Sequence, residues 1–193
     1  LKDLLDDFLR IADYHRAIGN RTLVIPYLPN FAKFTADDWR RTIDDVRHAA
    51  RTGTEAGFEM LYHNHDFEFT NRVGEVEVFD QIFGSIEPQL RGAEIDGFFV
   101  ADVGRDPAAL LRKFSGRLKR VHLKERAQPG SAAKNTELGR GTIDWLAVLA
   151  AAADLLEVHQ RDAAHLVHEL VELVDLEAQG VGDLLVAGGA AEA

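Results

Sequence analysis

The sequence predicts an α/β fold in which parallel strands alternate with helices around part of a βα barrel. Short apolar runs typical of buried strands alternate with amphipathic helical patterns, about one pair per 30 residues. Each predicted strand ends in polar residues, whereas a doubly wound sheet, which fits the same alternation, usually gathers its site at one switch point. The 193 residues, 46% of them hydrophobic, are enough for one core, so we expect a single domain over residues 1–193.

The individual elements follow from periodicity and from helix-capping signals. Thr35 and Asp38 resemble a capping box, and Asp106 before Pro107 is a typical start of a helix. Gly57 ends the helix that begins after Thr35. In chain order we predict helix 4–12, strand 22–26, helix 35–56, strand 58–64, helix 78–83, strand 92–96, helix 106–114, strand 118–123, a polar loop over 126–141, and a helix after residue 144.

Residues 62–69, Tyr-His-Asn-His-Asp-Phe-Glu-Phe, carry more chemistry than any other stretch of the chain. Because side chains alternate along a strand, His63 and His65 share one face, and Tyr62 and Asn64 share the other. Two imidazoles at a strand end can hold a divalent metal or move protons near neutral pH. A stacked histidine among turn residues is the competing interpretation, and the density of polar groups favours an active site.

Other strand ends carry further candidates. Asp96 follows a predicted strand and could be a carboxylate ligand, although an Asp before Gly97 is also a common turn residue. His122 and Lys124 share one strand face, where His122 suits a metal and Lys124 a substrate oxygen. An ordinary strand end with a solvated lysine is about as good an interpretation. The loop glycines after Glu137 could cradle a ligand, but a flexible turn explains their spacing at least as well.

Composition excludes several classes of protein. The formal net charge of −10 makes nucleic acid a poor partner, because an acidic surface repels phosphates. The chain has no cysteine, so any metal must be held by His, Asp and Glu. No apolar run approaches the ~20 residues of a membrane span, and no signal peptide opens the sequence. We therefore expect a cytoplasmic protein with no membrane or nucleic-acid partner.

These motifs together resemble the xylose-isomerase-like superfamily of sugar phosphate isomerases and epimerases. The resemblance covers about residues 1–150, and residues 151–193 look like a diverged helical tail. The order and spacing of all the motifs together are specific for this superfamily, whereas any one motif alone is weak evidence. The markers are Val24 to Tyr27, Tyr62 to Phe69, Glu94-Ile95-Asp96, Asp106-Pro107, Gly116-Arg117, Val121 to Lys124, and Gly139-x-Gly141 followed by Ile143-Asp144-Trp145.

The resemblance implies a (β/α)8 TIM barrel with a divalent metal (Mn, Mg, Zn or Co) at the C-terminal ends of its strands. The usual ligands are a Glu, an Asp, a His and a second Glu. By position Asp96 matches the Asp and His122 the His, while His63 stands where many relatives carry the first Glu. The second Glu has no convincing counterpart here.

The resemblance further implies an isomerase or epimerase that moves a proton next to the carbonyl of a sugar. We expect Glu68 or Glu137 to transfer the proton and Lys124 to hold a substrate oxygen. Tyr27, Asn64 and His65 would contact the substrate, with His63, Asp96 and His122 on the metal. A dehydratase or other lyase acting on a keto-sugar or keto-cyclitol fits the same scaffold. A non-catalytic sugar-binding or assembly module is the alternative from another class.

The chain begins on Leu1, without an initiator Met, and we expect that two early βα units of such a barrel are absent. The strand at 22–25 would then be an unpaired edge, which isolated proteins rarely tolerate. The helical pattern at 162–178 carries a broad apolar stripe that also needs cover. We therefore expect a homodimer whose interface includes one of these two segments.

Overall fold

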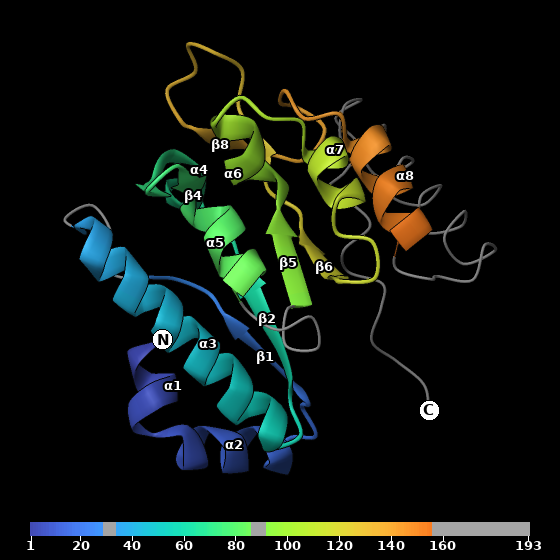
Figure 1. Cartoon of the computed structure of the whole chain (residues 1–193). Helices are drawn as coiled ribbons and strands as arrows, with labels where there is room; N and C mark the ends of the chain where they lie inside the picture. The colour runs from blue at the N-terminus through green and yellow to red at the C-terminus, as the bar shows by residue number, and fades with distance from the viewer. Residues whose placement is uncertain (29–33, 86–91, 156–193) are drawn as a thin grey trace, which may run out of the picture.

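The computed structural model describes residues 1–28, 34–85 and 92–155. Its main sheet consists of β1 (Thr22–Ile25), β2 (Glu59–His63), β5 (Gly92–Asp96) and β6 (Leu118–His122), shown in Figure 1. Two short antiparallel pairs are β3 (Arg72–Val73) with β4 (Val76–Glu77), and β7 (Glu125–Arg126) with β8 (Asn135–Thr136). The helices are α1 (Lys2–Asp6), α2 (Phe8–Ala17), α3 (Ala36–Glu55), α4 (Phe67–Thr70), α5 (Val78–Ser85), α6 (Gly97–Asp102), α7 (Pro107–Arg112) and α8 (Trp145–Leu155).

The order of the strands decides between the two predicted sheet types. The four strands lie side by side in the order β1-β2-β5-β6, which is their order along the chain, and all three neighbouring pairs are parallel. Among the described strands the order never reverses, so the sheet lacks the switch point of a doubly wound fold. The alternating, barrel-type prediction is therefore confirmed. These four strands do not close on themselves and form an open segment of a barrel.

Capping residues place the starts of two helices where the sequence predicted them. At the start of α3 the Asp38 N–H donates to Thr35 Oγ1 (3.2 Å), and the Thr35 N–H donates to Asp38 Oδ2 (2.8 Å). At the start of α7, Asp106 Oδ1 accepts a hydrogen bond from the N–H of Ala108 (2.9 Å). Both caps satisfy amide groups that a helix leaves without partners, and so they fix the helix ends beside the sheet.

The two faces of the sheet have different partners. Side chains directed at the helices form the hydrophobic core, and Tyr62 of β2 packs edge-to-face on Phe83 of α5 with ring centroids 6.0 Å apart. The next residue, His63, points to the opposite, inner face, where it meets Glu94 of β5. The alternation predicted for residues 62–65 therefore operates at the end of β2, and it delivers the polar side chains to the inner face.

The C-terminal half differs from the prediction in two respects, and the first is α6, a short helix that the sequence did not predict between the strand at 92–96 and the helix at 106–114. The second is that residues 126–141, which the sequence predicts as a loop, contain part of the short β7–β8 hairpin. These two strands could not be recognised from the sequence, because a strand of two residues is too short to show an alternation of apolar and polar side chains. The predicted helix over 162–178 lies outside the described residues, and the predicted dimer and single domain stay predictions.

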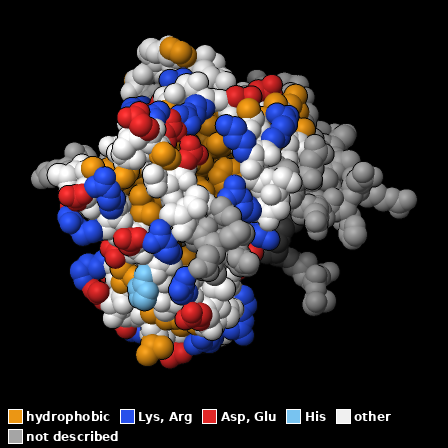
Figure 2. Space-filling model, viewed as in Figure 1, with side chains coloured by type: hydrophobic (Ala, Val, Ile, Leu, Met, Phe, Trp, Pro, Cys, Tyr) orange, Lys and Arg blue, Asp and Glu red, His pale blue; other side chains and the backbone are white. Residues whose placement is uncertain are grey.

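The surface around the sheet mixes both signs of charge. Figure 2 shows basic and acidic side chains interspersed over the face that carries α3 and α5, with hydrophobic side chains between them. Several of these charges pair within one helix turn, such as Arg41 with Asp38 at 2.6 Å. No helix in the described ranges is both long enough and apolar enough to cross a membrane.

Candidate metal centre

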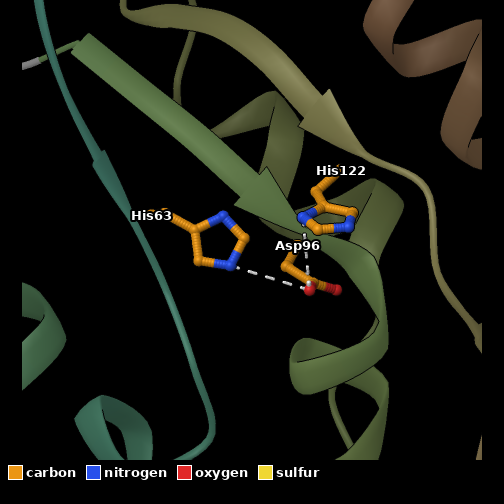
Figure 3. A group of neighbouring side chains, drawn as sticks. All are labelled: His63, Asp96 and His122. Carbon is orange, nitrogen blue, oxygen red and sulfur yellow. Dashed lines mark ion pairs between the residues drawn. The ribbon is translucent and has the colours of Figure 1, made fainter. Parts of the chain in front are cut away.

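Three side chains from three neighbouring strand ends converge on the inner face of the sheet (Figure 3). His63 ends β2, Asp96 ends β5 and His122 ends β6. His63 Nε2 lies 3.7 Å and His122 Nδ1 lies 3.8 Å from the same oxygen, Asp96 Oδ2. One potential ligand atom from each residue lies within 4.8 Å of the others. The three residues proposed from sequence as metal ligands therefore lie together.

The two oxygens of Asp96 have different roles. Oδ1 caps α6 by accepting a hydrogen bond from the N–H of Phe98 (2.8 Å). Oδ2 is buried and accepts no hydrogen bond from any residue that the structure describes. Oδ1 therefore acts as the turn residue that one interpretation of the sequence expected, and Oδ2 has the position that the ligand interpretation requires.

Asn64 locks Asp96 in place through the backbone. Its Oδ1 accepts from the N–H of Asp96 (2.9 Å), and its Nδ2 donates to the carbonyl of Asp96 (3.3 Å). The Asn64 side chain is completely buried. The structure therefore places this predicted substrate contact between two strand ends, where it fixes the position of Asp96.

A divalent metal fits this donor set. Burial raises the pKa of Asp96, against the opposing effects of His122 and the Phe98 N–H bond. A buried carboxylate oxygen without a hydrogen-bond donor is costly, and a cation in contact with it removes that cost. Two imidazole nitrogens and a carboxylate oxygen are ligands that divalent transition metals accept. The His122 side chain is 49% exposed, so the cluster can be reached from solvent.

His65 stands beside the cluster inside a set of aromatic rings. Its ring centroid lies 5.0 Å from that of His63, 4.6 Å from Phe99 and 5.2 Å from Tyr27, and the ring stacks on Phe67. Burial, followed by the nearby His63, lowers the pKa of His65 to about 4. His65 is therefore neutral near pH 7.

Lys124 supplies a cation at the same rim. It is half-buried, and its Nζ lies 4.1 Å from the ring centre of Phe98 and 4.6 Å from that of Phe99. Within the part of the chain that the structure describes, this ammonium makes no hydrogen bond or ion pair. Its donors are therefore available to an oxygen of a bound molecule.

Glu68 and Glu137, the predicted proton-transfer residues, lie in contrasting surroundings. Glu68 is fully buried, and it accepts hydrogen bonds from Tyr62 Oη (2.7 Å) and from the N–H of His65 (2.8 Å). Burial raises its pKa to about 7. Glu137 is exposed and accepts from Thr136 Oγ1 (2.7 Å), which lowers its pKa. The structure does not bring Glu137 into the cluster.

Two further acidic residues, to which the sequence analysis gave no role, have defined hydrogen-bond partners. Glu94 lies 2.9 Å from His63, and strand alternation from Asp96 could have placed it on the inner face. Glu125 is buried, and its carboxylate accepts hydrogen bonds from the segment 126–145. No sequence signal indicates Glu125, because most of its partners are 14 to 20 residues away along the chain.

Comparison with curated proteins finds dehydratases. An inosose dehydratase 2 of Bacillus cereus is 24% identical over 152 residues, which are 72% of this chain and 50% of that protein. An inosose dehydratase of Bacillus anthracis is 23% identical over 138 residues, 65% of this chain and 45% of that protein. The chain spans about half the length of the curated relatives it matches.

Comparison with solved structures supports the fold. A sugar phosphate isomerase/epimerase from Parabacteroides distasonis ATCC 8503 aligns with a TM-score of 0.61 at 21% identity, over 86% of this chain and 62% of that one. A probable 3-DHS dehydratase from Bacillus anthracis aligns with a TM-score of 0.64 at 12% identity, over 90% and 69%. The sequence model of the xylose isomerase-like TIM barrel family matches residues 2–170. The strand order, the site at the strand ends and this match agree: the chain belongs to the xylose isomerase-like TIM barrel family.

Proposed function

We propose that the protein transfers a proton next to the carbonyl group of a sugar or sugar-like substrate, with a divalent metal held by His63, Asp96 and His122. The observation that carries this proposal is the buried Asp96 Oδ2, which faces two imidazole nitrogens and accepts no hydrogen bond among the described residues. A metal bound there would polarise the carbonyl and so acidify the neighbouring C–H group.

Lys124 and the aromatic rim would bind the substrate. The Lys124 ammonium, beside Phe98 and Phe99, can donate to a substrate oxygen and stabilise negative charge that develops on it. Tyr27 is 47% exposed next to His65, so its ring can contact a sugar above the site. Asn64, with both ends of its amide on Asp96, acts on the substrate only through Asp96.

Geometry and acidity rank the two candidate proton acceptors, His65 and Glu68, differently. A pKa of about 7 suits Glu68 for general base catalysis near neutral pH. Glu68, however, is sealed on the helix side of the sheet, where Tyr62 and the His65 N–H occupy its oxygens. A base must reach the proton that it removes, so geometry takes precedence. We assign proton transfer to His65 and a structural role to Glu68.

Two reaction classes follow from the same first step. Return of the proton to the other face or to the neighbouring carbon gives an epimerase or isomerase. Loss of a hydroxyl group from the neighbouring carbon gives a dehydratase. The curated relatives named inosose dehydratase favour the second class for a keto-cyclitol. We propose first the isomerase or epimerase activity that the sequence resemblance implies, and second the dehydratase activity, which the names of these curated relatives favour.

Solvent exchange tests the step that both classes share. Metal-loaded protein in D2O is mixed with keto-sugars and a keto-cyclitol, and deuterium incorporation next to the carbonyl is followed by NMR. We expect exchange in at least one substrate, loss of exchange in His65→Gln, and unchanged exchange in the Glu137→Gln control. A new enone absorbance identifies the dehydratase, and a new epimer or isomer identifies the first class. Binding without exchange would contradict the proposal and favour a sugar-binding module.

The comparison of His65→Gln with Glu68→Gln tests the assignment of the base. We expect Glu68→Gln to retain exchange that His65→Gln has lost. The reverse result, with exchange lost only in Glu68→Gln, would move the proton-transfer role to Glu68.

A further inference from the structure

Glu94 occupies a defined place beside the three proposed ligands. In the register of the sheet His63 of β2 pairs with Glu94 of β5, and Glu94 pairs with Arg120 of β6. The neighbouring row on the same face contains Asp96 and His122. Glu94 therefore lies one row below the cluster, in line with one of its ligands.

The contact between Glu94 and His63 has a direction. Glu94 Oε1 lies 2.9 Å from His63 Nδ1, and a carboxylate at neutral pH can only accept hydrogen bonds. Nδ1 must therefore carry the proton of this bond. In a neutral imidazole the other nitrogen, Nε2, then has a free lone pair. That nitrogen is the one that lies 3.7 Å from Asp96 Oδ2.

Glu94 is itself restrained. Its other oxygen, Oε2, lies 4.0 Å from Arg120 Nη1 across the β5–β6 pair. The His63 and Glu94 side chains are 8% and 18% exposed, so water competes little for their bond.

We propose that Glu94 is a positioning residue that holds His63 as the Nδ1–H tautomer and thereby presents the free Nε2 to a metal beside Asp96. Without this acceptor, Nε2 can take the proton and donate to Asp96 instead, which would occupy both ligand atoms at once. Carboxylate partners of this kind commonly fix the tautomer of ligating histidines. The inference rests on the proposed metal centre for its purpose, but the tautomer itself can be tested without a metal.

The tautomer can be read in metal-free protein labelled with 15N, by long-range 1H–15N NMR of the imidazole rings near neutral pH. Signals of His63 are assigned by their loss in His63→Gln. We expect a neutral His63 protonated at Nδ1 in the wild type and in Glu94→Gln, whose amide oxygen still accepts. We expect Nε2-protonated His63 to appear in Glu94→Leu. Glu59→Leu is the matched control, because Glu59 is an exposed β2 residue that pairs with Lys119 at 3.5 Å.

Metal titration gives the second readout. Zn2+ or Mn2+ affinity, measured by calorimetry, should fall about 10- to 100-fold in Glu94→Leu and less in Glu94→Gln, with no change in the Glu59→Leu control. Circular dichroism confirms that each variant is folded. A wild-type His63 protonated at Nε2, or a Glu94→Leu variant with the wild-type tautomer and affinity, would overturn the proposal. A wild type that binds no metal but has the Nδ1–H tautomer would refute the metal centre while supporting the positioning role.

Discussion

Asp96 and Glu125 are both buried carboxylates at the C-terminal side of the sheet, and they differ in how their oxygens are satisfied. Glu125 Oε1 accepts from the N–H groups of Arg126, Thr142 and Ile143, and Oε2 accepts from the Gly139 N–H and Trp145 Nε1, at 2.6 to 3.2 Å. In Asp96, Oδ1 accepts from the N–H of Phe98 at the start of α6, whereas Oδ2 accepts no hydrogen bond from the described residues. Burial alone therefore does not mark a functional acid; an unsatisfied oxygen that faces other ligands does.

The hydrogen bonds of Glu125 hold residues 126–145 in their folded arrangement. Its carboxylate gathers the two ends of the stretch that contains the β7–β8 hairpin and ties them to the start of α8. A Cβ on Gly141 would lie only 2.2 Å from Glu125 Oε1, so a residue with a side chain cannot occupy that position without displacement. This acid serves the fold, and it has no acceptor capacity left for a ligand.

Glu125→Gln should have the largest effect on stability. The variant keeps the size of the side chain but turns an amide NH2 toward N–H donors and leaves some of them buried without an acceptor. We expect the free energy of unfolding to fall by about 2–4 kcal/mol, measured by urea denaturation. Glu137→Gln, on the same segment but exposed, is the control and should be unchanged. Equal stability of both variants would mean that the Glu125 hydrogen bonds do not hold this segment.

Glu68 is a third buried carboxylate, and the pH dependence of stability can test how well its charge is compensated. It accepts hydrogen bonds from Tyr62 Oη and from the N–H of His65. Burial raises its pKa from 4.5 to about 7, so the folded protein retains a proton that the unfolded chain loses. The stability of the wild type relative to Glu68→Gln should therefore be greatest below pH 4.5, fall as pH rises to about 7, and then level off.

The size of this change follows from the pKa shift. At about 1.36 kcal/mol per pKa unit, the relative stability should fall by up to about 3 kcal/mol across that range. Urea denaturation of both proteins at a series of pH values measures it. A constant difference between the two proteins would show that Glu68 is as well satisfied when ionised as Glu125.

His122→Ala should lower metal affinity with little effect on stability, unlike substitutions of the buried acids Glu125 and Glu68. The His122 side chain is 49% exposed and its described contacts are with the cluster, so we expect the unfolding free energy to change by less than about 1 kcal/mol. Metal affinity should fall at least about tenfold, because one of three ligands is lost. Calorimetric titration with Zn2+ or Mn2+ measures it, and unchanged affinity would remove His122 from the proposed centre.

The difference between Asp96 and Glu125 also explains which features could be predicted from the sequence. Strand periodicity and helix caps placed the four parallel strands, and the strand ends indicated His63, Asp96 and His122 because polar residues follow apolar runs there. The hydrogen bonds of Glu125 depend on chain segments far apart in sequence, which no local pattern encodes. The sealed position of Glu68 depends on Tyr62 and the turn at His65, so a residue inside the most suggestive motif lies on the helix side of the sheet.

The most direct test of the metal centre is the metal stoichiometry of the wild type and of Asp96→Asn. Asn at position 96 keeps an oxygen that can cap α6, but it removes the charge that faces His63 and His122. After dialysis against Zn2+ or Mn2+ and removal of free metal, elemental analysis should find one ion per chain in the wild type and almost none in a folded Asp96→Asn variant. Equal metal content in both proteins, or none in the wild type, would contradict the proposal that the unsatisfied oxygen of Asp96 is a metal ligand.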